Sequence, residues 1–138
     1  MNATLAPAFP TIAAGVAAIL GLLAALLTLR VILGRVRHRV NAGDGGHSDL
    51  GQAIRAHANL VEQAPLAIVV LALAESAGAA RTPVLVLGAA LVVARLASAW
   101  GLSRSLGLSA GRQAGAGLTL LVTVLTSLLL AYRLLQTT

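Results

Sequence analysis

Long uncharged stretches constrain this chain more than any other feature of its sequence. Asp, Glu, Lys and Arg are absent from residues 1–29, 63–74, 82–94 and 113–131. The whole chain is 58% hydrophobic and has a mean hydropathy of +0.91, which fits neither a soluble domain nor a disordered segment. A helix needs about 20 apolar residues to cross a hydrocarbon layer about 30 Å thick. The sequence therefore predicts a small integral membrane protein of the all-α class.

The chain divides into four helices within one domain that covers residues 1–138. We expect these helices at about 8–34, 49–77, 82–103 and 111–135, packed as a four-transmembrane-helix bundle with short loops. Arginines are more numerous around the first and third loops than elsewhere: Arg35, Arg37, Arg39, Arg104 and Arg112 against Arg81 and Arg133. Because positive residues favour the cytoplasmic side, we expect both termini outside.

Composition excludes several classes of function. The net charge of +6 comes with only 2% aromatic residues and no separate basic domain, so it is interpreted as a topology signal and not as a nucleic-acid surface. The chain has no Cys, which excludes disulfides, thiolate metal sites and a protein thiol nucleophile. The spacing of His38 and His47 matches no metal motif, so we expect no metal site. Any thiol chemistry would need a thiol from a bound molecule.

The two middle helices carry charge into the membrane. Their uncharged sections, 63–74 and 82–94, amount to only about 18–20 Å of helix at 1.5 Å per residue. Residues 55–62 or Glu75 in the second helix, and Arg95 in the third, must therefore lie in the hydrocarbon or at its edge, where an ionisable side chain costs about 2.5–3.5 kcal/mol. Arg95 either extends to the headgroups from a helix end or pairs with Glu62, within one subunit or between two. We prefer the pair.

Four polar side chains lie within eight residues of the second helix: Arg55, His57, Asn59 and Glu62. At about 100° per residue, Arg55, Asn59 and Glu62 share one face, whereas His57 points to nearly the opposite side. The shared face offers a guanidinium fork, an amide and a carboxylate. Those groups suit a small zwitterion that has both charges and a peptide bond.

These residues resemble a known family. The matching segments are Gly43-Asp-Gly-Gly46, Leu50, Arg55-x-His57-x-Asn59-x-x-Glu62-x-x-Pro65, Glu75 and Arg95-x-x-x-x-Trp100-Gly101. They are similar to those of the MAPEG family, the membrane-associated proteins in eicosanoid and glutathione metabolism, and most similar to its bacterial branch. The resemblance implies a homotrimer in the bacterial inner membrane, with sites between neighbouring subunits that face the cytoplasm.

The resemblance also implies roles for individual residues. Arg55, Asn59 and Glu62 would hold the co-substrate glutathione, with Arg55 facing a carboxylate and Glu62 facing the γ-glutamyl ammonium group. His57 and Arg95 would lie near them. An arginine near the start of the fourth helix would stabilise the glutathione thiolate and so lower the thiol pKa. Arg112 is the candidate catalytic residue for that role, and Arg104 is the reserve. The expected reaction is transfer or peroxide reduction on a lipophilic electrophile.

Three residues keep a second interpretation open. Transferases of this family often carry Tyr after the helix-two Glu, where this chain has Gln63, and polar aromatic groups on the third helix, where it has Ser98 and Leu102. The alternative is a non-catalytic protein of the same fold that binds a lipid or organises partners. A small multidrug exporter is disfavoured, because that class needs a carboxylate in the first helix and this chain has none there.

Overall fold

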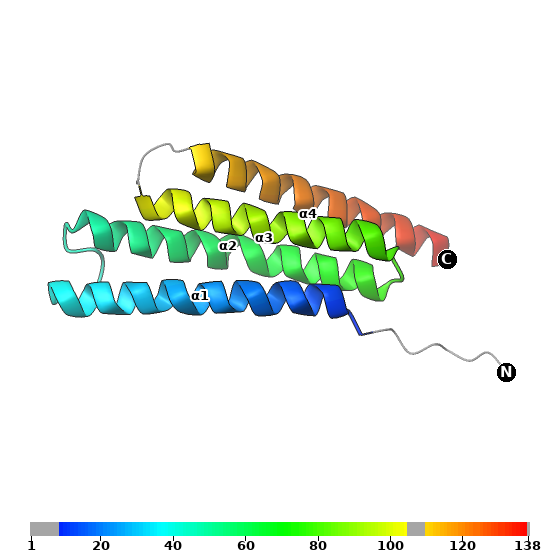
Figure 1. Ribbon diagram of the computed structural model, residues 1–138. Helices are drawn as coiled ribbons and strands as arrows, with labels where there is room; N and C mark the ends of the chain where they lie inside the picture. The colour runs from blue at the N-terminus through cyan, green and yellow to red at the C-terminus, as the bar shows by residue number, and fades with distance from the viewer. Residues whose placement is uncertain (1–8, 105–109, 138) are drawn as a thin grey trace.

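Four helices in series form an up-and-down bundle in the computed structural model, which describes residues 9–104 and 110–137. They are α1 (Thr11–His38), α2 (Ser48–Ser76), α3 (Arg81–Arg104) and α4 (Ala110–Thr137). Successive helices run in opposite directions (Figure 1). All four are long and apolar enough to cross a membrane. The expected all-α, four-helix membrane fold is confirmed.

The first helix begins and ends a few residues later than the sequence predicts. It begins at Thr11, after Pro10, and continues to His38, four residues beyond the expected end. Arg39 then ends it in the left-handed conformation, with φ of 56°. Basic residues in the last turn, Arg35 and Arg37 among them, favour this extension because they face the partial negative charge of the helix C-terminus.

The bundle has α2 and α3 at its centre. Each of these helices contacts α1 and α4, whereas the described parts of α1 and α4 do not contact each other. Large apolar side chains cover the outside of the bundle, as Leu22 (69% exposed) and Leu128 (62% exposed) illustrate. Such a surface suits lipid and not water. The interface between α3 and α4 is very close, because a Cβ on Gly115 would lie 2.6 Å from the Ala94 carbonyl oxygen.

One end of the bundle collects most of the arginines. It holds the C-termini of α1 and α3 and the N-termini of α2 and α4, and we name it the arginine-rich end (Figure 1). Arg35, Arg37, Arg39, Arg104 and Arg112 belong to it. At the opposite end, the Glu75 carboxylate of α2 accepts hydrogen bonds from the backbone N–H groups of Ile12 and Ala13, at 2.9 and 2.8 Å. These are donors that the first turn of a helix leaves unpaired, so Glu75 ties the start of α1 to the end of α2.

Candidate functional site

Arg95 lies at the centre of a polar cluster inside the bundle and is only 1% exposed. Its Nη1 donates to Asn59 Oδ1 at 3.2 Å, with a longer contact of 3.5 Å to the Asn59 carbonyl. Its Nη2 donates to Ser98 Oγ at 3.1 Å and to the Gly115 carbonyl at 3.0 Å. The Nε atom is buried and has no partner among the described residues. One guanidinium therefore connects α2, α3 and α4.

These contacts correct the expected pairing of Arg95. Its partners are neutral, and no ion pair with Glu62 occurs within residues 9–104 and 110–137. An extension to the headgroups is equally wrong, since the side chain is enclosed by its own chain. Because the Arg95 side chain is buried within its own chain, it also cannot form a direct ion pair with a second subunit. The physical reason is Gly115: without a Cβ there, the α4 backbone approaches α3 closely enough for its carbonyl to accept from Arg95.

Asn59 is held in one orientation by this cluster. Its side-chain oxygen accepts from Arg95, so its amide N–H groups remain as donors for another molecule. Asn59 itself is only partly buried. The cluster therefore fixes which half of the amide is available at the surface of α2.

A groove of about 520 Å³ lies between α2 and α4, next to this cluster. Its lining residues are Glu62, Gln63 and Leu66 of α2 and Ala116, Gly117, Thr119, Leu120 and Thr123 of α4. Glu62 is exposed, and so is Arg55 two turns earlier on the same face of α2. Of the three residues on that face, only Glu62 lines the groove, whereas Arg55 and Asn59 lie on α2 between the groove and the arginine-rich end.

Arg112 lies nearer the arginine-rich end than the groove and is not among its lining residues. It precedes the lining residue Ala116 by four positions, which places both on one face of α4. Since α2 and α4 both start from the arginine-rich end, Arg55 and Arg112 each lie about one turn nearer that end than the Asn59–Gly115 level fixed by Arg95. Arg112 is half-buried there.

The other two candidate residues lie elsewhere. The Arg104 guanidinium carbon is 3.9 Å from the centre of the Trp100 ring, in a cleft between α1 and α3. His57 is half-buried and points away from the Arg55–Glu62 face. Among the described residues, no cluster of three or more His, Cys, Asp and Glu side chains is arranged to hold a metal ion.

The sequence missed two members of the buried cluster. In the sequence analysis, Ser98 is only a departure from related transferases, and Gly115 is not among the expected site residues. The structure makes both of them acceptors for Arg95. Ser98 could have been found from its spacing, because it lies three residues after Arg95 on the same helix face. Gly115 could have been found from its size, because a small residue lets the backbone carbonyl of α4 come close to α3.

Comparison with known proteins gives the family of this chain. Residues 13–132 match the MAPEG family. The inner membrane protein YecN of Escherichia coli K12 is 40% identical over 90 residues, which cover 62% of this chain and 69% of YecN. The YecN protein of E. coli O6:H1 matches with the same identity and coverage. The match includes the second helix and the buried Arg95 cluster, and the chain belongs to the MAPEG family.

Proposed function

We propose that this protein binds glutathione in the groove between α2 and α4 and uses its thiolate to attack lipophilic electrophiles. One observation carries the proposal. Arg55 and Glu62 are exposed on a membrane helix, and within residues 9–104 and 110–137 neither has a hydrogen-bond or ion-pair partner. Charged groups at that depth need partners. A zwitterionic ligand supplies both.

The spacing of the charges fits a tripeptide. Arg55 and Glu62 are seven residues apart, which is about 10.5 Å along a helix, and three extended residues span about 10–11 Å. Arg55 would donate to a carboxylate, Glu62 would accept from the γ-glutamyl ammonium group, and the Asn59 amide would donate to a peptide carbonyl. The proposal thus uses all three of these polar groups.

The proposal gives Arg112 the role of thiolate stabiliser. Its place four residues before Ala116, which lines the groove, supports that role over Arg104, which lines another cleft, between α1 and α3. A guanidinium beside the sulfur favours the thiolate over the thiol. The thiolate then forms a carbon–sulfur bond with the electrophile, and the leaving group or the adjacent carbon takes the electron pair.

The assembly and location belong to the same proposal. Three copies would form a homotrimer, with a second subunit covering the exposed Arg55–Glu62 face and closing the site. The name of the E. coli relative supports an inner-membrane location. The arginine-rich end would face the cytoplasm, with both termini outside, because arginine-rich loops are retained on that side.

The test is a titration of glutathione into the detergent-solubilised protein, followed by calorimetry and by ultraviolet absorbance of the thiolate. We expect saturable binding with a thiolate band. Arg55→Ala and Glu62→Ala should each abolish binding while the oligomer stays intact, and Arg81→Ala, an exposed arginine at the other end, should bind like wild type. If both groove variants bind like wild type, the assignment of the site fails.

Arg112→Ala separates binding from activation. We expect this variant to bind glutathione and to raise the pKa of the bound thiol, because the nearby positive charge is lost. The thiolate absorbance, titrated against pH, measures the change. An unaltered titration would remove Arg112 from the mechanism.

A second candidate function is a non-catalytic member of the family. Ser98 (2% exposed) and Leu102 (1% exposed) favour it, because both are buried against the bundle and neither reaches an open groove. The third helix then contributes no hydroxyl to a bound thiol. Glutathione binding without a thiolate band would support a site that lacks activation, and no binding would support a structural role for the charged groups.

A further inference from the structure

A second cleft lies across the α2–α3 pair from the glutathione groove, between α1 and α3. It has a volume of about 420 Å³ and is lined by Leu23, Leu27 and Arg30 of α1 and by Leu96, Ala99, Trp100, Ser103 and Arg104 of α3. The apolar residues lie toward the middle of the bundle, and the polar ones lie at the arginine-rich end. The cleft is therefore amphipathic along its length.

Two guanidinium groups occupy the polar end of this cleft. Arg104 stacks over the Trp100 ring at 3.9 Å, and Arg30 Nη2 donates to the Ser103 carbonyl at 3.4 Å. Both arginines are thus held against the last turn of α3. No Asp or Glu lines the cleft. A pair of guanidinium groups without a carboxylate favours an anion, and their fork geometry matches phosphate oxygens.

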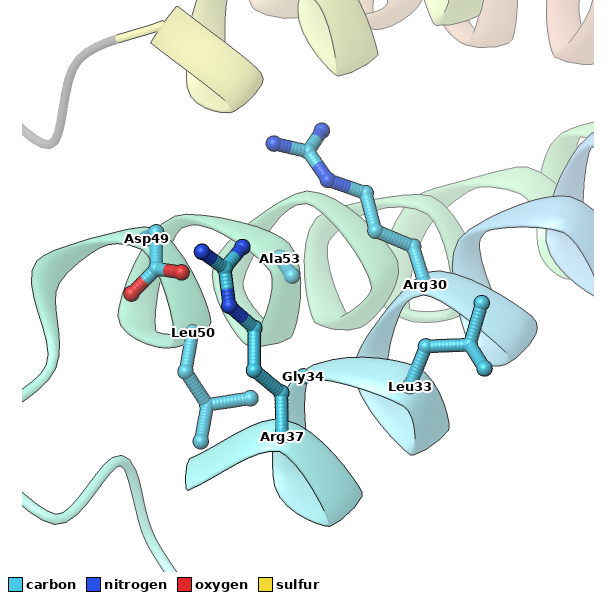
Figure 2. Close-up of a pocket in the computed structure, with 7 residues that line it drawn as sticks. All are labelled: Arg30, Leu33, Gly34, Arg37, Asp49, Leu50 and Ala53. Atoms are coloured by element: carbon cyan, nitrogen blue, oxygen red, sulfur yellow. The ribbon is translucent and has the colours of Figure 1, made fainter.

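Arg30 also lines a neighbouring polar pocket between α1 and α2. This pocket has a volume of about 310 Å³, and its lining residues are Arg30, Leu33, Gly34, Arg37, Asp49, Leu50 and Ala53 (Figure 2). Figure 2 shows the Arg30 side chain extending away from α1 and the Arg37 side chain beside Asp49. Arg30 therefore lines both the cleft between α1 and α3 and a polar pocket that has hydrogen-bond donors and acceptors.

The depth of these groups in the membrane matches a lipid headgroup. The 28 residues of α1 extend about 42 Å at 1.5 Å per residue, more than the hydrocarbon thickness of about 30 Å. The arginine-rich end therefore reaches the headgroup layer. Trp100 is 62% exposed one turn before the end of α3, where interfacial Trp residues are common. A soluble anion would need only the guanidinium pair, whereas a phospholipid also needs the apolar cleft.

We propose that this cleft binds one anionic phospholipid. Its phosphate lies between Arg30 and Arg104, an acyl chain follows Leu23, Leu27 and Leu96, and its headgroup enters the pocket beside Arg37. Basic pockets between helices at the cytoplasmic membrane surface recognise anionic lipids in this way. The site is separate from the glutathione groove, since the described parts of α1 and α4 do not meet.

Trp100 allows a direct test, because it is the only Trp in the chain and lies in the cleft. The full-length protein is reconstituted in vesicles of phosphatidylcholine that contain phosphatidylglycerol or phosphatidylcholine with brominated acyl chains, and quenching of Trp fluorescence is measured. We expect brominated phosphatidylglycerol to quench at several-fold lower mole fraction than brominated phosphatidylcholine. Arg30→Gln should reduce that preference about fivefold, the usual contribution of one arginine near an anionic surface.

Arg39→Gln is the matched control, since it removes one exposed arginine at the same end without altering the cleft. It should keep the wild-type preference, and Arg30→Lys should keep more of it than Arg30→Gln. Inorganic phosphate in the buffer should not relieve quenching. Equal quenching by the two lipids, equal losses in Arg30→Gln and Arg39→Gln, or displacement by inorganic phosphate would each overturn the proposal.

Discussion

Arg55 and Arg95 lie toward the same end of the bundle, yet the fold places them in opposite environments. Arg55 is exposed on the outer face of α2, whereas Arg95 is enclosed by α2, α3 and α4 and donates to three of its neighbours. Both Nη groups of the buried arginine are hydrogen-bonded within the chain. Arg55 has no hydrogen-bond or ion-pair partner among the described residues, which leaves it available to a ligand or a second subunit. The comparison separates polar groups that build the bundle from those that serve a site.

The largest expected effect is the loss of the buried guanidinium. Arg95→Met removes the donor shared by Asn59, Ser98 and Gly115, and hydrogen bonds to a charged group contribute about 1.5–3 kcal/mol each. After allowance for the relief of burying a charge, we expect a loss of about 3 kcal/mol of unfolding free energy. Unfolding of the purified protein in mixed detergent micelles measures it.

Arg55→Met is the control for this prediction. Because Arg55 is exposed, its removal should change the unfolding free energy by less than about 0.5 kcal/mol. If Arg95→Met proves as stable as wild type, the buried cluster is not what holds α2, α3 and α4 together, and the contrast between the two arginines loses its energetic basis.

Gly115→Ala tests the close approach that makes the buried cluster possible. The added methyl group would lie 2.6 Å from the Ala94 carbonyl oxygen, and it would also meet Ser98 Oγ. Overpacking of this kind costs about 1–3 kcal/mol, and we expect about 2 kcal/mol from the same unfolding measurement. Gly117→Ala is the matched control. Its Cβ would meet nothing within 4 Å, so it should be neutral or slightly stabilising.

Whether the sequence predicts a feature of the structure depends on how far apart in the chain the interacting residues lie. Uncharged stretches define four helices, and helical spacing puts Arg55, Asn59 and Glu62 on one face, because both depend only on local periodicity. The partners of Arg95 depend on how closely α4 approaches α3 at Gly115, which no local pattern encodes. The link from Glu75 to Ile12 and Ala13 joins residues more than 60 positions apart, so local periodicity does not predict it either.

Glu75 and Glu62 extend the comparison to the two glutamates of α2. Glu75→Gln weakens two hydrogen bonds to the start of α1, and loss of such a cap costs about 1 kcal/mol. Glutathione binding should not change in this variant. Glu62→Gln should show the reverse result: wild-type stability, with glutathione affinity at least tenfold weaker by calorimetry, as expected for a lost charge-assisted bond. Weaker binding in both variants to the same extent would mean that the two carboxylates do not have separate roles.

The smallest expected effect concerns buried hydroxyls. Thr126 is as buried as Arg95, but its hydroxyl donates to the Val122 carbonyl of its own helix, at 2.7 Å. Since that carbonyl belongs to the regular α4 ladder, Thr126→Val leaves no group without a partner, and we expect a change below about 0.5 kcal/mol. Ser98→Ala removes an acceptor from Arg95 and should cost about 1 kcal/mol or more in the same unfolding measurement. Equal costs would show that burial alone sets the energetic weight of a hydroxyl in this bundle. A larger cost for Ser98 would show that the polar groups that stabilise the bundle are those bonded to Arg95.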